Sequence, residues 1–555
     1  MQSLDSRKDL LCALAVFLLA ITNWAGRLAG PIDLRWDAGL YYTLGTSLYE
    51  GKGYRLLNEP GEVRANQYPL LLPAIVAVHQ RITRSTDPFI TGRLMRRSWM
   101  ILYLLYIPGV FWLAKRFVGR RLAVVVTLIT LLNPQSTFLS EAAFAELPFA
   151  VTSLSFFLLR PARRRAATII AFIAATASYL LRTIGITLLA AWTLDAVRQR
   201  RFRSAAARAA LSMIPVIGWQ TYVHSVETSA EYQQPAYAYQ RAEYMFYNVS
   251  YAVNIKLKDP FHPTDGRATV SDFVVRSLRN LWPLTFGLAE SVTSSNNYWH
   301  QQLDWTGRWL PRFGPAVLIR GSQLLVAILI LIGLNRLFYL EPAIVFYLGL
   351  SLLVVAIAPW PSQYIRYLSP MAPYIAMALV LGLTVISRLL PLNHATYLTA
   401  IMLCLILVQQ AISLFLLYRN DQNNVTEMTR NGERVRFRLF YYDEGFRSLD
   451  AAQDWIRERT RMTDVIAAGA PHWLSLRTGR KAIMVPFGAD PPTLERLLAE
   501  VPVNYFIFDD IVPLSLSSFV APAIEHSSGW RQVFTSDGHC RVFERIGSGV
   551  EGAVH

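Results

Sequence analysis

Runs of apolar residues long enough to cross a lipid bilayer recur along this 555-residue chain and constrain its fold more than any other feature. A membrane-spanning helix needs about 20 predominantly apolar residues. The sequence therefore predicts a polytopic all-α membrane bundle of about 11 transmembrane helices. The predicted spans are 10–28, 97–114, 122–139, 143–159, 167–182, 184–197, 207–224, 316–334, 342–358, 368–387 and 396–417.

Basic residues lie between these apolar runs rather than along them. The formal net charge is +16, although 53% of the residues are hydrophobic and the mean hydropathy is +0.29. Arginines gather in three short loops at 115–121, 160–165 and 198–203. Such loops are typical of the cytoplasmic side of a membrane. The positive charge therefore indicates membrane orientation, and the sequence contains no recognisable nucleic-acid-binding module.

The spacing of the three basic loops predicts the orientation of the chain. An even number of spans separates each loop from the next, so we expect all three, and the N-terminus, on the cytoplasmic side. The first outer loop, 30–96, and the C-terminal segment then lie outside. Residues 69–82 are apolar but too short to span, and we expect them to lie in the outer interface. Span 10–28 lacks a convincing cleavage site and is interpreted as a retained helix.

The stretch 36–73 places an acidic residue at a membrane boundary. Asp37 follows the first span and precedes a predicted short amphipathic helix, two glycine turns and then Tyr68. An ionisable residue at such a boundary points to a functional site. An aspartate before a helix is also a common N-cap. The residues alone leave both interpretations of Asp37 open.

Asp37, Tyr41, SLYEGKGY at 47–54 and YPLLLP at 68–73 resemble the first outer loop of the GT-C membrane glycosyltransferases. The pattern is most similar to the bacterial branch related to protein mannosyltransferases and lipid A aminoarabinose transferases. The chain departs from many relatives at Ala38, where they carry a second acidic residue. The resemblance implies an inverting enzyme of the bacterial inner (plasma) membrane. It would move a sugar from a polyprenyl-phosphate-linked donor to a lipid or polysaccharide acceptor on the outer face.

Such a transfer needs a base for the acceptor hydroxyl and positive charge for the departing phosphate. The resemblance implies Asp37 as the general base. It implies Glu141 as a second acid, because the SE pair at 140–141 resembles the family's second outer loop. Glu146 is nearly equivalent by its spacing. A helix cap for Asp37 and a solvated helix end for Glu141 are the alternatives.

Two arginines and three tyrosines complete the expected substrate-binding set. Arg182 lies at a turn between two spans. Arg366 and Tyr367 lie in a proline-rich segment that resembles the family's RYxxPxxP sequence. A guanidinium suits phosphate binding, whereas an interfacial arginine also extends its charge to water without any ligand. Tyr41 and Tyr68 are the expected tyrosine contacts, although tyrosines are common at membrane interfaces.

The composition changes after residue 420. Alternating helical and strand patterns predict a small α/β extracytoplasmic domain at 421–555, following a transmembrane module at 1–420 with a large Tyr- and Trp-rich outer loop at 226–315. The C-terminal domain contains no glycine-rich nucleotide motif. We therefore expect it to be dispensable for the chemistry.

The sequence indicates no certain cofactor. A divalent metal ion held by Asp37 and Glu141 stays open, since no His/Asp cluster has ligand spacing. The three cysteines lie too far apart for a disulfide framework. The expected partners are the lipid-linked sugar donor, a lipid or glycan acceptor and membrane lipids, without nucleic acid. A transporter or flippase for lipid-linked glycans is the alternative, as is a non-catalytic member of an envelope complex, but ionisable residues gathered at one face favour the enzyme.

Overall fold

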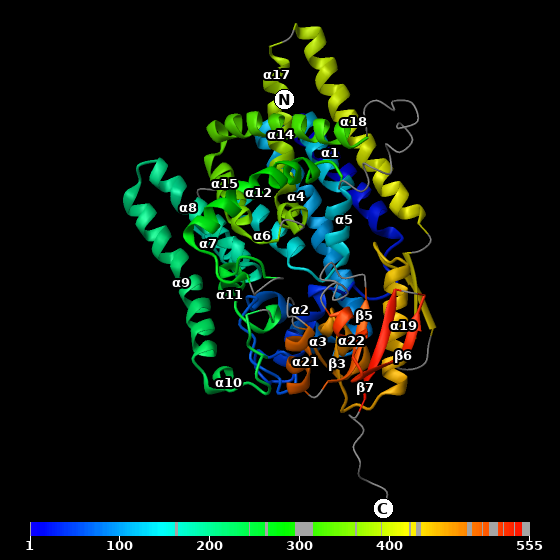
Figure 1. Ribbon diagram of the computed structural model, residues 1–555. Helices are drawn as coiled ribbons and strands as arrows, with labels where there is room; N and C mark the ends of the chain where they lie inside the picture. Colours follow the sequence, from blue (N-terminus) through cyan, green and yellow to red (C-terminus); the bar gives the residue numbers. More distant parts are fainter. Residues whose placement is uncertain are drawn as a thin grey trace, which may run out of the picture. The chain divides into compact units, whose positions relative to one another are not determined.

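The computed structural model divides into two compact units. Figure 1 shows its helices and strands, coloured along the sequence. Unit 1 comprises Met1–Ala29, Arg96–Ile217 and Phe273–Asp421, and unit 2 comprises Gly30–Met95, Gly218–Asp272 and Gln422–His555. The boundary predicted near residue 420 is thus one of several, because two earlier segments group with the C-terminal one. The structure describes residues 2–160, 165–243, 245–260, 265–294, 315–360, 363–389, 391–420, 423–428, 434–485, 491–501, 503–509, 520–525, 527–537 and 539–546.

Long apolar helices make up most of unit 1, and a helix lies at each predicted span. α4 covers most of the two spans 97–114 and 122–139 as two helical stretches joined by a kink at Gly119, where φ is 76° and ψ is 171°. The helices are α1 Gln2–Ala25, α4 Pro88–Leu132, α5 Pro134–Glu141, α6 Glu146–Leu159, α7 Arg165–Leu181, α8 Ile186–Arg198, α9 Phe202–Glu227, α12 Val270–Glu290, α14 Pro315–Leu340, α15 Pro342–Ile357, α16 Tyr364–Leu368, α17 Ala372–Ser387 and α18 Leu392–Arg419.

The helix lengths confirm a multi-pass membrane protein. Within the described residues, five helical stretches are long and apolar enough to cross a membrane: Ser6–Ala25, Pro88–Leu132, Val317–Leu340, Tyr364–Ser387 and Tyr397–Arg419. Shorter apolar helices are Glu146–Leu159, Ala166–Leu181 and Pro342–Ile357. The exact number of spans stays a prediction.

Two glycines allow α14 and α17 to pack backbone against backbone. A methyl group at Gly333 would lie 1.6 Å from the carbonyl oxygen of Ala378. One at Gly382 would lie 1.9 Å from the carbonyl oxygen of Leu329. Small residues at such contacts are typical of helix pairs in membranes, where van der Waals packing drives association. A larger side chain at either glycine would force the helices apart.

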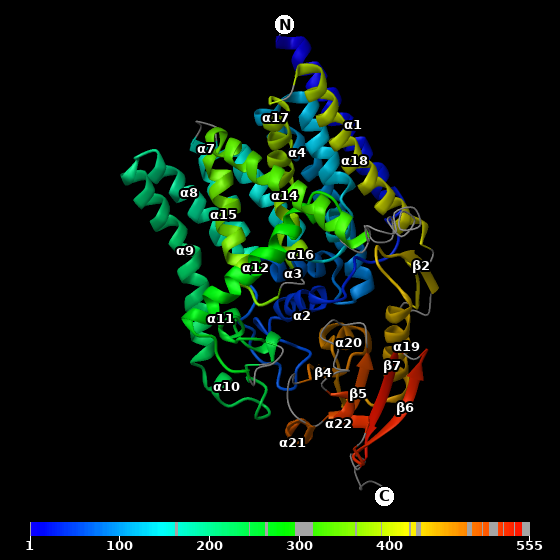
Figure 2. The same ribbon diagram turned by 45° about the horizontal axis from the view of Figure 1, so that its top comes forward.

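Unit 2 contains a mixed five-stranded sheet of order β4-β3-β5-β7-β6. The central strand β5 (Val503–Asp509) is parallel to β3 (Val465–Ala467) and antiparallel to β7 (Cys540–Arg545). β3 also pairs in parallel with β4 (Lys481–Ile483), and β7 pairs antiparallel with β6 (Trp530–Ser536). Figure 2 shows β5, β7 and β6 side by side. The predicted C-terminal α/β domain is thereby confirmed.

Both faces of this sheet are covered. On one face, Ile466, Ile507 and Val542 pack against α19 (Glu444–Arg459). On the other face, Phe506 and Phe508 pack with residues from the separate segment 237–246. Further elements of the C-terminal segment are α20 Pro471–Thr478, α21 Pro491–Glu500, α22 Ala521–Glu525 and the antiparallel pair β1 Asn424–Met428 and β2 Arg434–Arg438.

The segment 30–95 of unit 2 supplies a packed pair of helices, α2 (Asp37–Tyr49) and α3 (Leu71–Thr83). A methyl group at Gly45 of α2 would lie 2.6 Å from the side chain of Val76 in α3, so the two helices meet closely there. α3 has 13 residues, fewer than a span requires. Val78 and Ile82 are exposed on it. This short amphipathic helix fits the interfacial position expected for residues 69–82.

Residues 226–315, expected to be a loop, include three helices. They are α10 Ala230–Gln233, α11 Tyr251–Lys256 and the longer α12, and a short 3-10 turn, η2, spans Phe246–Asn248. α12 is amphipathic, and Val274, Leu278 and Trp282 are exposed on it. Its moderate overall hydropathy explains why it was not predicted as a helix. Residues 244, 261–264 and 295–314 of this loop lie outside the described residues.

The predicted orientation can be tested by cysteine labelling. We expect a cysteine at the exposed Arg203 to react only from the cytoplasm, and one at the exposed Glu458 only from outside. Ser448 would be a poor probe, because it is buried and its hydroxyl donates to the Ser536 carbonyl. Cys12 and Cys404 should be replaced by serine for this measurement. Labelling of Glu458→Cys only after permeabilisation of the inner membrane would contradict the orientation.

Candidate functional site

The SLYEGKGY segment forms a tight loop that fixes the backbone at Tyr68. Gly51 and Gly53 have φ angles of 73° and 84°, a left-handed conformation that glycine adopts without strain. The Ser47 hydroxyl donates to the Gly53 carbonyl at 2.8 Å. The Tyr54 hydroxyl donates to the Tyr68 carbonyl at 2.9 Å. The residues that carry the family resemblance therefore build the loop and hold Tyr68.

Asp37 is the first residue of α2, and its side chain is half-buried. The N-cap position belongs to Trp36, which has a φ of 61°, and no described side chain caps this helix end. Asp37 is therefore not the N-cap, although a negative charge in the first turn still favours the helix dipole. The Tyr247 hydroxyl donates to Asp37 Oδ1 at 3.3 Å. A left-handed tryptophan stores strain, a feature found often at functional sites.

Tyr68 lies in a cluster of aromatic rings. Its ring centroid is 5.1 Å from that of Tyr41 and 5.4 Å from that of Tyr251, both in edge-to-face geometry. Burial, together with the negative charge of Asp37, raises the pKa of Tyr68 well above its usual value. Its hydroxyl therefore stays protonated at physiological pH. Tyr41 is also buried, so its ring supports Tyr68.

Helix α20 of the C-terminal segment packs against α2. A methyl group at Gly39 would lie 3.1 Å from the Trp473 backbone nitrogen, so only a glycine fits easily there. The His472 ring lies 4.7 Å from the Tyr247 ring, with the two planes at 87°. Burial lowers the pKa of His472 to about 3, so this imidazole is neutral. Its Nε2 atom has no hydrogen-bond partner in the described part of the chain.

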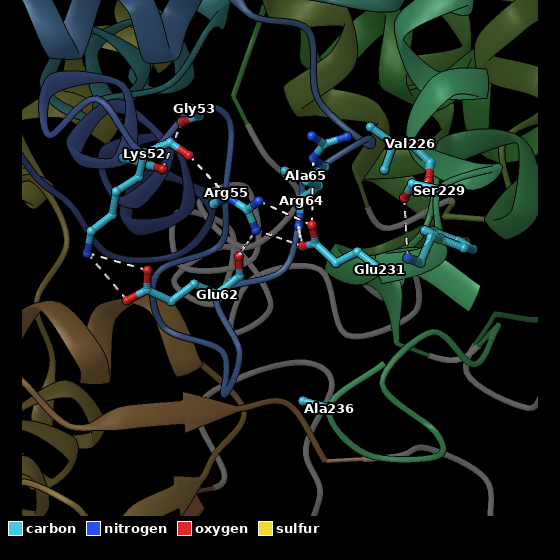
Figure 3. A network of polar contacts seen from close by, with 12 residues as sticks. Lys52, Gly53, Arg55, Glu62, Arg64, Ala65, Val226, Ser229, Glu231 and Ala236 are labelled. Carbon is cyan, nitrogen blue, oxygen red and sulfur yellow. Dashed lines mark hydrogen bonds and ion pairs between the residues drawn. The ribbon is translucent and has the colours of Figure 1, made fainter. Parts of the chain in front are cut away.

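Ion pairs join the loop 52–65 to the segment that contains α10 (Figure 3). Arg55 donates to both carboxylate oxygens of Glu231, at 2.7 and 3.1 Å. The Arg64 backbone nitrogen donates to Glu231 Oε1 at 3.1 Å. Arg55 also donates to the Glu62 carbonyl at 2.9 Å. These contacts fix the loop that precedes Tyr68 against the part of unit 2 that carries Tyr247.

In unit 1, Arg182 and Arg366 converge on one carboxylate, that of Glu146. Arg182 Nη1 lies 2.8 Å and Arg366 Nε 2.5 Å from Glu146 Oε1. The Glu146 side chain is 1% exposed, whereas those of Arg182 and Arg366 are 16% and 17% exposed. Arg182 stacks over Tyr367, and Arg366 over Phe144. Two predicted phosphate-binding residues, far apart in sequence, therefore share one buried anion.

Glu141 has a different environment. It is the last residue of α5, and its Oε1 atom lies 3.0 Å from Arg96 Nη2 and 3.3 Å from Arg27 Nη1. All three side chains are at most 3% exposed. Arg96 also donates to the Ala29 carbonyl at 2.7 Å, and Arg27 stacks over Trp24. This closed arrangement is typical of a structural ion pair, and the role of Glu141 as second acid stays a prediction.

A metal ion does not fit the predicted ligands well. Two guanidinium groups already neutralise Glu141, and a cation would meet their positive charge. Within the described residues, no group of three or more His, Cys, Asp or Glu side chains is arranged to hold a metal. We therefore derive no step through a metal.

Sequence reasoning missed four residues of these clusters. Arg27 lies at the end of the first predicted span and Arg96 stands among several other arginines, so neither could be distinguished from orientation signals. Tyr247 is one of many tyrosines in its segment. His472 lies in the C-terminal segment, more than 400 residues from Asp37. A basic residue beside an apolar span, such as Arg27, was the one available signal.

Comparisons with known proteins give structural but not sequence matches. No family model matches the chain, and no curated protein matches it. The oligosaccharyltransferase of Archaeoglobus fulgidus, in complex with Zn and sulfate, matches with 13% identity and a TM-score of 0.51, covering 96% of this chain and 73% of that one. Its apo form matches with 14% identity and a TM-score of 0.49, covering 90% and 69%.

A further match is ArnT from Cupriavidus metallidurans bound to undecaprenyl phosphate, with 13% identity and a TM-score of 0.44 over 98% of both chains. At such identities a match speaks for the fold alone, and the first one extends over nearly the whole chain. The fold expected from the resemblance of the first outer loop is thereby confirmed. The chain has the same fold as the Archaeoglobus fulgidus oligosaccharyltransferase.

Proposed function

We propose that this chain is a membrane glycosyltransferase. It moves a sugar from a polyprenyl-phosphate-linked donor to a lipid or polysaccharide acceptor on the outer face of the bacterial inner membrane, with inversion at the anomeric carbon. A fold alone does not specify a function, so the proposal depends on the chemistry of named side chains. A solved structure with the same fold is an oligosaccharyltransferase, which agrees with a sugar-transfer reaction.

The observation that carries the proposal is the pairing of Arg182 and Arg366 on Glu146. Both guanidinium groups lie within 2.8 Å of the same oxygen, Glu146 Oε1. Both arginines stay partly exposed, and each is held by an aromatic ring as well as by Glu146. A pre-arranged, partly exposed pair of guanidiniums suits a phosphate group. Glu146 acts here as the residue that holds the two arginines together.

In the proposed reaction, Asp37 removes the proton from the acceptor hydroxyl. The acceptor oxygen forms a bond to the anomeric carbon while the bond from that carbon to the phosphate oxygen breaks. The electron pair of the broken bond stays on the phosphate oxygen, which leaves polyprenyl phosphate. Arg182 and Arg366 stabilise the charge that develops there. Tyr68 supplies a protonated hydroxyl as a donor to the sugar or the phosphate.

The proposal is tested by incubating the purified protein in detergent with a panel of polyprenyl-phosphate monosaccharides. We expect one member of the panel to release polyprenyl phosphate, slowly by hydrolysis and faster when a membrane-lipid extract supplies an acceptor. Release from none of the panel members would contradict the proposed function. Movement of an intact lipid-linked glycan across reconstituted vesicles, without release, would favour the flippase instead.

Replacing Arg366 by lysine tests the phosphate site. Lysine keeps the charge and a long stem but loses the planar pair of donors, so we expect donor binding or turnover to weaken by at least about tenfold, or about 1.4 kcal/mol. Arg182→Lys should have a smaller effect. Donor affinity and initial rate in detergent are the measurements. Arg208→Lys is a matched control, because Arg208 is 21% exposed, pairs with Asp195 and stacks over Trp192. Wild-type values for Arg366→Lys would mean that Arg366 serves only as a charge.

A further inference from the structure

We propose that Tyr247 and His472 are positioning residues for Asp37, so that the C-terminal domain contributes to the reaction through α20. This inference rests on the proposed function, because it takes Asp37 as the general base. The three residues come from the three separate chain segments of unit 2. Their contacts all lie within that one unit.

The Tyr247 hydroxyl is directed at the carboxylate. It donates to Asp37 Oδ1 at 3.3 Å. A donor on one oxygen of a carboxylate restricts the orientation of the group. Tyr247 can therefore hold Asp37 in a reactive orientation without contacting the substrate.

The backbone on both sides of Tyr247 is anchored. Phe246 is 7% exposed and belongs to the apolar cluster on one face of the sheet. Asn248 is 3% exposed, and its side chain donates to the Gln240 carbonyl at 3.1 Å. The Asn254 side chain donates to the Phe246 carbonyl at 3.3 Å. These contacts restrict the motion of the backbone on both sides of Tyr247. The orientation of the Tyr247 side chain then depends on the residues that its ring and hydroxyl contact.

His472 restrains the tyrosine ring. The two ring centroids lie 4.7 Å apart with nearly perpendicular planes, a favoured geometry for aromatic pairs. His472 is 3% exposed and follows Pro471, the first residue of α20. α20 in turn packs on α2 at Gly39, two residues after Asp37. The imidazole is neutral, so it restrains Tyr247 by packing against its ring and does not act as a proton donor.

This arrangement changes the expectation for the C-terminal domain. The absence of a nucleotide motif predicted that the domain would be dispensable for the chemistry. The structure instead places its His472 against the tyrosine that contacts the candidate base. Loss of the domain would remove the His472 ring that packs against Tyr247, and it would remove α20, which packs against α2. We therefore expect the domain to be needed for full turnover.

The test uses the full-length protein and the polyprenyl-phosphate monosaccharide that the wild-type protein turns over. Tyr247→Phe keeps the ring and removes the hydroxyl, so kcat should fall about tenfold while KM for the donor changes less than about twofold. His472→Ala should lower kcat similarly. His472→Phe should restore most of the lost kcat, because it again packs an aromatic ring against Tyr247. The double variant Tyr247→Phe/His472→Ala should be little worse than the poorer single one, since both act through Asp37.

Tyr505→Phe is the matched control. It removes another tyrosine–carboxylate hydrogen bond of unit 2, that to Glu544 at 3.1 Å, and should leave kcat unchanged. Amide hydrogen exchange is a second measurement, and it needs no sugar donor. Exchange at residues 245–251 should be faster in His472→Ala than in the wild type, and unchanged in Tyr505→Phe.

The outcomes separate this inference from the proposed function. Wild-type kcat for Tyr247→Phe, in a protein that Asp37→Asn inactivates, would overturn the positioning role and leave the base in place. Unchanged exchange at 245–251 in His472→Ala would overturn the role of His472. A wild-type protein that turns over no donor would overturn the proposed function, and this inference with it.

Discussion

Replacing Asp37 by asparagine is expected to lower sugar transfer by about two to four orders of magnitude while leaving the fold intact. Asparagine has nearly the same shape, but its amide cannot accept the proton of the acceptor hydroxyl. The structural cost should be small, because Asp37 is half-buried at the start of α2 and the N-cap position belongs to Trp36. The measurement is the initial rate of polyprenyl phosphate release, beside a thermal unfolding curve in detergent.

A matched control is available in the same unit. Glu444 is an exposed acidic residue in the first turn of α19, so Glu444→Gln removes a charge from a comparable helix end. It should change neither the rate nor the unfolding temperature appreciably. If Asp37→Asn turned over its donor at nearly the wild-type rate, Asp37 would have only an electrostatic role at its helix end, and the base would have to be another residue.

The second large effect is expected on stability. Glu141→Gln removes the negative charge between Arg27 and Arg96, which are 3% and 1% exposed. Breaking a buried ion pair from one side leaves charges unpaired inside the protein and typically costs about 3–5 kcal/mol. We expect Glu141→Gln to lower the unfolding temperature strongly and to reduce the yield of folded protein. Thermal and denaturant unfolding in detergent provide the measurement.

Glu146→Gln is the natural comparison for Glu141→Gln. Its two arginines are 16% and 17% exposed, so water can compensate part of the lost charge. It should cost less stability and instead impair donor binding, because Arg182 and Arg366 lose their common anchor. If Glu141→Gln folded as the wild type does and lost turnover, Glu141 would be the second acid that the SE resemblance implies.

Much of the fold could be predicted from local patterns. Apolar runs of spanning length gave a helix at each expected place in unit 1. Alternating helical and strand patterns after residue 420 predicted the small α/β domain that contains the five-stranded sheet. α12 could not be predicted, because an amphipathic helix with a proline, Pro283, and two arginines has neither the hydropathy of a span nor a clean helical signal.

The candidate site was only partly predictable. Asp37, Arg182 and Arg366 were recognisable as charged residues beside apolar spans, where a charge needs a partner. Their partners were not recognisable, because Glu146 meets Arg366 across 220 residues and Tyr247 meets Asp37 across 210. Such contacts depend on tertiary packing, and a single sequence carries no signal of it. For the same reason, two similar carboxylates, Glu141 and Glu146, could not be assigned different environments.

The most direct test of sugar transfer is mass spectrometry of the envelope glycolipids and polysaccharides of the host cell. Cells that lack the protein, the same cells with the wild-type protein, and the same cells with Asp37→Asn should be compared. We predict that one glycan loses the mass of one sugar residue without the protein, and that the wild-type protein restores it while Asp37→Asn, expressed at an equal level, does not. Glycans of unchanged mass in all three strains, or full restoration by Asp37→Asn, would contradict the account.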